Sequence, residues 1–177
     1  DNLIMTQIEK WKNSPVMTEE EKNELAGMTD EQLVSAFSSD LEFGTAGLRG
    51  VMGLGTARMN VYVIRRATKG LAVYLKNHFE EPKVAISYDS RNNSRRFAEA
   101  AAGVLAKAGI KTYMYAEMMP VPVLSYTTRY LNCDAGIMIT ASHNPKQYNG
   151  YKVYAATGGQ ILDAAADEIL AEIMKLD

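Results

Sequence analysis

Apolar residues recur at helical spacing in three parts of the chain. The stripes run from position 61 to 79, from 97 to 108 and from 166 to 176. A period of about 3.6 residues is typical of helices that bury one face against a core. The stripes consist of Val61, Ile64, Thr68, Leu71, Ala72, Leu75 and Phe79, then Phe97, Ala101, Val104, Leu105 and Ala108, and finally Ala166, Ile169, Leu170, Ile173 and Leu176. Gly109, directly after the second stripe, predicts a helix C-cap.

Short apolar runs between these stripes predict strands. The runs are Lys83–Tyr88, Lys111–Tyr115 and Ala135–Thr140, and the last is continuous, as a buried central strand should be. Gly150–Ala156 can return as an antiparallel strand after the polar loop 141–149, and Val121–Leu131 can form a further helix. Strands that alternate with helices predict an α/β layered domain with a mostly parallel sheet.

The first forty residues carry signals of short helices. Thr18 with Glu21, and Thr29 with Gln32, have the spacing of a capping box, in which each side chain satisfies a free backbone N–H at a helix start. The segment Glu42–Gly55 then contains five glycines. Glycine at this density indicates a bent strand and loop whose backbone must approach something closely.

Composition narrows the classes of function. Of 177 residues, 47% are hydrophobic and 23% charged, which is ordinary for one globular domain. Nineteen basic and 21 acidic residues give a net charge of -2, which argues against nucleic acid or an anionic membrane as the main partner. No run approaches the roughly 20 apolar residues of a membrane helix. A single cysteine, Cys133, fits a reducing cytoplasm. The chain begins with Asp1 and ends in a helical pattern, so we expect a piece of a longer protein.

The loop after the Ala135–Thr140 strand contains the most reactive group of side chains. Ser142, His143 and Asn144 lie there in the sequence Thr-Ala-Ser-His-Asn-Pro. In open α/β sheets, ligands bind beyond the carboxyl ends of the strands. Pro145 and the later Asn149-Gly150 pair are turn-formers, which predicts an exposed loop that reverses the chain.

Two segments together resemble the α-D-phosphohexomutases, the phosphoglucomutase and phosphomannomutase type of enzyme. Gly136–Tyr154 is similar to the phosphoserine loop of that family and the strand that follows it, and Leu41–Gly50 (LEFGTAGLRG) resembles its N-terminal catalytic segment. Tyr88–Arg91 and Pro120–Pro122 also lie where the first domain of the family has similar residues. Thr18–Phe37 resembles the helical extension of longer phosphoglucomutase and phosphopentomutase members.

The resemblance implies a three-layer αβα sandwich with a mixed, mostly parallel sheet. It divides the chain into an N-terminal helical extension, residues 1–40, and domain I, residues 41–177. It also implies a reaction in which Ser142 carries a phosphoryl group, gives it to a sugar monophosphate to form a bisphosphate, and takes back the other phosphoryl group. Ser142 suits this cycle because a covalent carrier divides one difficult transfer into two easier ones.

The remaining site residues are implied in the same way. His143 matches a position tied to phosphoryl transfer, Lys152 matches a proposed general acid/base, and Arg49 matches an arginine near the transferring group. Asn144 and Arg91 are expected to bind substrate or to shape the site. Mg²⁺ is expected to touch the phosphate on Ser142, with its other ligands in a DGDGDR-like segment of a second domain, which this sequence lacks.

The expected partners are the phosphosugar substrate, a sugar bisphosphate activator and the protein's own C-terminal domains. Without those domains we expect folding but negligible turnover. Glucose 1-phosphate is the expected substrate, with phosphopentose as the alternative. Two other readings stay open at this point: a sugar-phosphate-binding module without chemistry, and a hydrolase built on Cys133 and His143. Lys152 could also be a solvated charge, and His78 a cap or surface residue.

Overall fold

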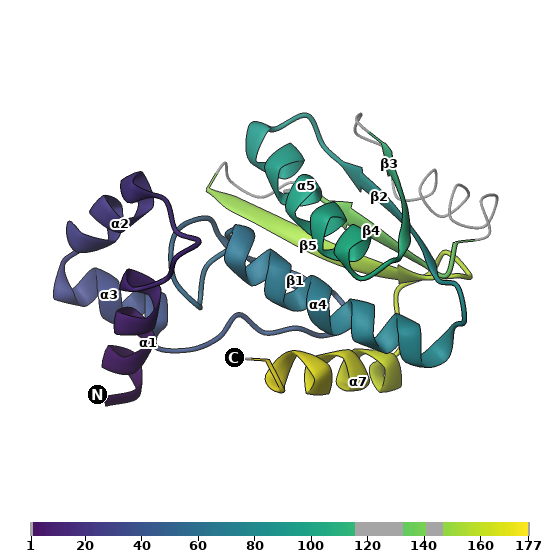
Figure 1. Cartoon of the computed structure of the whole chain (residues 1–177), viewed down its shortest axis with the longest axis horizontal. Coiled ribbons are helices and arrows are strands. Elements are labelled where there is room, and N and C mark those ends of the chain that lie inside the picture. Colours follow the sequence, from purple (N-terminus) through teal and green to yellow (C-terminus); the bar gives the residue numbers. More distant parts are fainter. Residues whose placement is uncertain (1, 116–132, 141–146, 177) are drawn as a thin grey trace.

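The computed structural model describes residues 2–115, 133–140 and 147–176. Helices α1, α2 and α3 come first and are followed by alternating strands and helices, as Figure 1 shows. The elements are α1 (Asn2–Lys12), α2 (Glu19–Ala26), α3 (Asp30–Phe37), β1 (Leu48–Val51), α4 (Val61–His78), β2 (Lys83–Tyr88), α5 (Asn92–Lys107), β3 (Lys111–Tyr115), β4 (Ala135–Ile139), β5 (Tyr148–Ala155) and α7 (Asp163–Met174).

The strands form one mixed sheet in the order β1-β5-β4-β2-β3. Strand β2 pairs in parallel with both β3 and β4, whereas β5 runs antiparallel to β4 and to β1. Every residue of the central strand β4 is buried, as its continuous apolar sequence predicts. The expected α/β fold with a mixed, mostly parallel sheet is therefore confirmed, and so is the antiparallel return of β5.

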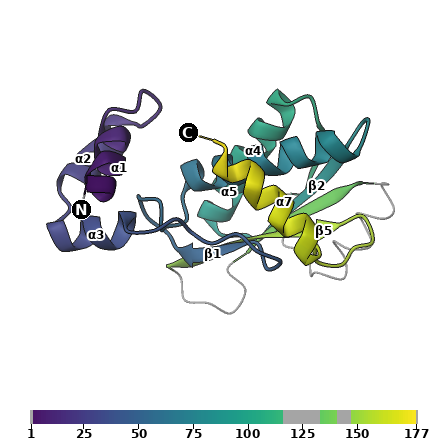
Figure 2. The ribbon, with the colours of Figure 1, turned by 90° about the horizontal axis from the view of Figure 1, so that it is seen from below.

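Helices α4, α5 and α7 pack together against one face of the sheet (Figures 1 and 2). Their apolar stripes meet alternate strand residues in a single core. The buried strand residues on this face are Leu48, Val84, Ile86, Tyr88, Ala135, Ile137, Ile139, Tyr151 and Val153. The intervening positions Ala85, Ser87, Met138 and Tyr154, which point to the opposite face, are buried as well.

The N-terminal helices have a smaller core of their own. Both expected capping boxes are present. The hydroxyls of Thr18 and Thr29 each accept from the N3 backbone N–H, and their own backbone N–H groups donate to the side chains of Glu21 and Gln32. Trp11 packs edge-on against Phe37 and against Tyr62 of α4, with ring centroids 5.3 and 5.4 Å away. The aromatic contact with Tyr62 fastens this helical group, seen apart from the sheet in Figure 2, to the larger core.

Most local expectations hold in the described residues, and one does not. Gly109 has φ 79° and its N–H donates to Ala106 O, while Ile110 N–H donates to Leu105 O, which is a Schellman C-cap. The Asn149-Gly150 pair, expected in a turn, lies instead inside strand β5, which begins at Tyr148. The expected helix 121–131 lies outside the described residues.

None of the described helices has the length and apolar character needed to cross a membrane.

Candidate functional site

The carboxyl ends of β2 and β4 lie side by side at one edge of the sheet. Tyr88 pairs with Ile139, and the N–H of Asp89 donates to Ile139 O at 3.1 Å. One residue further, Thr140 and Gly150 exchange two backbone hydrogen bonds of 3.0 and 3.1 Å. This exchange closes the base of the loop that carries the expected Ser142, His143 and Asn144. Those three residues lie outside the described part of the chain.

Strand β1 supports the other side of the same loop base. Arg49 pairs with Gly150 and Val51 with Tyr148, and Met52 N–H donates to Gln147 O at 2.6 Å. The loop base is thus held between β4 and β1. The glycine-rich segment, whose backbone was expected to approach something closely, therefore contacts the strand that leaves the loop.

Gly47 shows why the approach requires glycine. Its φ is 75°, in the left-handed region, and a Cβ at this position would lie 1.9 Å from the carbonyl oxygen of Tyr151. A side chain here would have to push β5 away from β1. The expectation of close backbone approach is confirmed at this residue.

Arg49 and Lys152 share one face of the sheet. Leu48 and Tyr151, which pair with each other, both point into the core beneath α4, where Tyr151 Oη lies 2.9 Å from Thr68 Oγ1. Strand alternation then turns Arg49 and Lys152 to the opposite face. Arg49 is opposite Gly150, so Lys152 is its diagonal neighbour on the adjacent strand. Residues in this relation are roughly 7–8 Å apart.

This pair of cations is suited to an anion. Arg49 is exposed and Lys152 half-buried, and the described residues offer Lys152 no ion-pair partner. Two positive side chains on one face attract phosphate oxygens, and the planar guanidinium adds paired donors. The sequence-predicted Arg49 and Lys152 are thus brought together within two residues of the loop base.

The turn between β2 and α5 brings Arg91 to the same edge. Asp89 is 3% exposed, and its Oδ1 accepts from Arg91 N–H at 3.1 Å, which shapes the turn. Arg91 is half-buried, and its Nη1 is buried without a hydrogen-bond partner among the described residues. A guanidinium nitrogen in this state favours an anionic ligand, because an unpaired buried donor is costly.

Asn149 and Ser94 are two further residues of this edge that the sequence did not single out for function. Both are fully buried, and Asn149 Nδ2 donates to Ser94 Oγ at 3.0 Å. Asn149 Oδ1 also accepts from Gly150 N–H at 2.8 Å. The Asn-Gly dipeptide indicated a turn because asparagine and glycine tolerate left-handed backbone. The tertiary contact with α5 decides the conformation instead.

Metal and cysteine chemistry find no support in the described residues. Across residues 2–115, 133–140 and 147–176, no group of three or more His, Cys, Asp or Glu side chains is placed to hold a metal ion. Burial, aided by the negative charge of Asp134, raises the pKa of the Cys133 thiol, which is 2% exposed. A buried, protonated thiol is a poor nucleophile.

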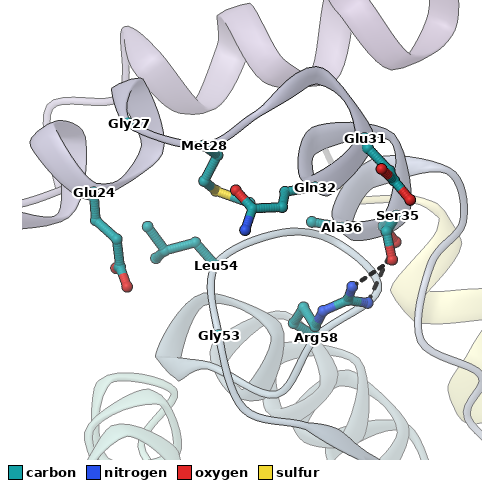
Figure 3. A pocket seen from close by; sticks show the side chains of 10 residues that line it. All are labelled: Glu24, Gly27, Met28, Glu31, Gln32, Ser35, Ala36, Gly53, Leu54 and Arg58. Carbon is teal, nitrogen blue, oxygen red and sulfur yellow. Dashed lines mark hydrogen bonds between the residues drawn. The ribbon is translucent and has the colours of Figure 1, made fainter.

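A separate pocket lies at the N-terminal helices. It lies between α2, α3 and the loop around Leu54, as Figure 3 shows. Its volume is about 610 Å³. On one side Arg58 Nη2 donates to Ser35 Oγ at 2.6 Å. None of the residues that line this pocket is an expected site residue, so we place the candidate site at the sheet edge.

Known proteins are similar to this chain over most of its length. The sequence profile of the family described as phosphoglucomutase/phosphomannomutase, alpha/beta/alpha domain I, matches residues 40–177. A phosphopentomutase of Mus musculus is 44% identical over 162 residues, which is 86% of this chain and 26% of the relative. A phosphoglucomutase of Staphylococcus haemolyticus (strain JCSC1435) is 46% identical over 140 residues, 79% of this chain and 26% of the relative.

Solved structures show the same fold. A crystal structure from Thermus thermophilus, provisionally described as a phosphomannomutase, superimposes with a TM-score of 0.70 at 34% identity, over 76% of this chain and 30% of that one. The described sheet and helices form an α/β fold, and the match to the family's alpha/beta/alpha domain I defines the class as that of the sugar-phosphate mutases. The chain belongs to the phosphoglucomutase/phosphomannomutase family, in which it is domain I. It spans about a quarter of the length of the curated relatives it matches.

Proposed function

We propose that this chain is the phosphoryl-carrying domain of a mutase that interconverts sugar 1-phosphates and 6-phosphates. The observation that supports this most is that the segments carrying Arg49, Lys152 and Arg91 all adjoin the base of the loop to which Ser142 belongs. Three cations from three separate elements at one sheet edge fit a substrate rich in phosphate. Family membership supports the reaction class, because the named relatives are mutases.

In the proposed reaction, Ser142 begins as a phosphoserine. The bond between its Oγ and phosphorus breaks while the free hydroxyl oxygen of the sugar monophosphate bonds to that phosphorus. The sugar hydroxyl loses its proton and the serine Oγ gains one. The bisphosphate then reorients, and the reverse transfer returns its other phosphoryl group to Ser142, so the net change is the position of one phosphate.

The cations have distinct parts in this proposal. Arg49 binds the equatorial oxygens of the transferring group, where negative charge must be stabilised. Lys152 moves the proton of the sugar hydroxyl or stabilises the same oxygens. Arg91 binds the phosphate that is not being transferred. His143 and Asn144 complete the set, His143 by hydrogen bonding to the moving group and Asn144 by fixing the loop.

In this proposal the phosphate on Ser142 would supply a ligand to Mg²⁺. The described residues do not form a metal site by themselves. We propose that the other ligands come from a second domain of the complete protein, where the ion would neutralise charge on the transferring group. The same argument leads us to propose negligible turnover for the 177-residue chain alone, and robust turnover from it would contradict this.

The proposed sugar is glucose, with a pentose as the second candidate. The similarity to a staphylococcal phosphoglucomutase favours the first, and the similarity to a mouse phosphopentomutase favours the second. Comparing kcat/KM for glucose 1-phosphate and for a pentose 1-phosphate in the complete protein would decide between them.

Replacing Ser142→Ala in the complete protein tests the proposed function. We expect turnover to fall by at least about 10³-fold, because the carrier of the phosphoryl group is lost. Binding of a sugar phosphate should persist, since the cations remain. Full activity of the variant would refute the proposal. A wild-type protein that binds sugar phosphate but shows no mutase activity would favour the binding module without chemistry.

A further inference from the structure

The buried hydrogen bond between Asn149 and Ser94 joins two parts of the candidate site that are far apart in sequence. Asn149 lies at the start of β5, next to Gly150, which pairs with Thr140 at the loop base. Ser94 lies in the first turn of α5, and its backbone N–H donates to Arg91 O at 3.1 Å. The 3.0 Å bond between the two side chains therefore connects the loop base directly to the turn that carries Arg91.

The surroundings of this bond make it rigid. Both residues are fully buried, so water cannot replace either partner. The other end of the Asn149 carboxamide is also fixed, because its Oδ1 accepts from Gly150 N–H at 2.8 Å. Gly150 N–H donates in addition to Thr140 O at 3.0 Å. The carboxamide thus has one defined orientation, and it links β4, β5 and α5.

We propose that Asn149 and Ser94 are a positioning pair for phosphoryl transfer. The pair holds the base of the Ser142 loop at a fixed distance from Arg91, so that the carrier serine and the substrate phosphate are aligned. Neither residue touches substrate. This inference rests on the proposed function, because it assigns the pair to the transfer from Ser142.

A matched control is available on the same strand. Tyr151, two residues after Asn149, is also fully buried and makes a side-chain hydrogen bond of 2.9 Å to a helix residue, Thr68. That bond ties β5 to the middle of α4 rather than to the Arg91 turn. Tyr151→Phe therefore removes a buried bond of the same strand without releasing the connection between the loop base and α5.

The experiment compares Ser94→Ala, Asn149→Ala, the double variant and Tyr151→Phe in the complete protein. For each variant we would measure kcat and KM with glucose 1-phosphate, the rate at which glucose 1,6-bisphosphate phosphorylates Ser142, and the melting temperature. We expect Ser94→Ala to lower kcat and the phosphorylation rate by roughly 10- to 100-fold, the effect of misplacing a reacting group by about 1 Å. KM should change by less than about threefold, because the cations that bind substrate remain.

The double variant tests whether the two residues act through the same bond. If they do, its kcat should be no lower than that of the slower single variant. If their effects were independent, the two losses of kcat would multiply. Tyr151→Phe should keep kcat within about twofold at a comparable loss of melting temperature. Should Ser94→Ala fail to fold, Ser94→Cys preserves the shape and has a much weaker acceptor, so the same loss of kcat is expected of it.

The outcomes separate the two hypotheses. If Tyr151→Phe lowers kcat as much as Ser94→Ala, or if Ser94→Ala and Ser94→Cys leave kcat unchanged, the positioning role is wrong and the proposed function stands. If the wild-type protein never accepts phosphate on Ser142, the proposed function fails and the positioning role fails with it. The positioning role is supported if kcat falls while KM changes little, and if the double variant is no slower than the slower single variant.

Discussion

Arg91 presents the sharpest test at the scale of single residues. Its Nη1 is buried without a hydrogen bond among the described residues, at the edge where the serine loop begins. A phosphate oxygen would satisfy this donor, and the energy gained would appear as substrate affinity. In the complete protein, we expect Arg91→Gln to raise KM by roughly 10- to 100-fold, since a hydrogen bond to a charged group contributes about 1.5–3 kcal/mol.

Arg95 is the control for that variant. It lies one turn further along α5, is well exposed, and pairs with Glu99 at 3.0 Å in an i, i+4 arrangement. Exposed pairs of this kind contribute little to stability, so Arg95→Gln should fold like the wild type. Because Arg95 is not a residue of the candidate site, the substitution should leave KM within about twofold. An equal rise in KM for both variants would mean that general charge, not the buried position of Arg91, governs affinity.

The positions of some residues of the candidate site could be anticipated from the sequence and those of others could not, for a physical reason. The positions of Arg49, Lys152 and Arg91 near one edge of the sheet could be anticipated from short motifs and from the order of strands and helices, and their roles stay predictions. Asn149 could not be found in this way. The Asn149-Gly150 dipeptide favours a turn locally. The strand conformation is stabilised by the buried contact of Asn149 with Ser94, which lies 55 positions earlier in the chain. Ser142, His143 and Asn144 stay predictions.

At the scale of elements, Glu21 connects the N-terminal helices to the α/β body. Its carboxylate accepts from Thr18 N–H at 3.0 Å and from Tyr62 Oη, and lies 3.7 Å from Arg96 Nη2. Burial acts to raise the pKa of Glu21, but the bonds from Tyr62 and Thr18, with the charge of Arg96, together lower it below 4.5. One carboxylate thus caps α2 and contacts both α4 and α5.

This arrangement predicts a pH-dependent effect of Tyr62→Phe on the stability of the chain. A carboxyl group whose folded pKa is lowered stabilises the fold above its unfolded pKa, and the contribution is lost as pH falls through the folded value. We expect the variant to lose about 1 kcal/mol of unfolding free energy near pH 7. The difference from wild type should shrink towards pH 4, as urea unfolding at about pH 7 and about pH 4 would show.

Tyr74→Phe provides the comparison. Tyr74 stacks on His78 with ring centroids 4.4 Å apart, and its hydroxyl makes no hydrogen bond among the described residues. Its removal should change stability by less than about 0.5 kcal/mol at either pH. A Tyr62→Phe effect that stays constant from pH 7 to pH 4 would mean that Glu21 does not carry the coupling.

Elements were easier to predict than the contacts between them. Helices α4, α5 and α7 follow from apolar stripes, and α2 and α3 from capping boxes, because these signals act over a few residues. The edge strand β1 could be anticipated as a bent strand among glycines, but not its pairing with β5. Its pairing depends on Gly47, where β5 leaves no space for a Cβ. The division of the chain between residues 40 and 41 stays a prediction.

At the scale of the whole molecule, the chain corresponds to domain I of its family. It spans about a quarter of the curated relatives, and its described residues hold three cations at the candidate site without a cluster of metal ligands. An anion held on one side only is open to water, and phosphoryl transfer requires that water be excluded. We therefore propose that later domains close over Arg49, Arg91 and Lys152.

The central claim is that Ser142 carries the phosphoryl group, and phosphopeptide mapping tests it most directly. The complete protein would be analysed by intact mass and peptide mass spectrometry before and after incubation with glucose 1,6-bisphosphate. We predict one phosphoryl group per chain, located on Ser142, which is removed again by excess glucose monophosphate. Absence of phosphate from Ser142 under both conditions, or its presence on another residue, would contradict the account.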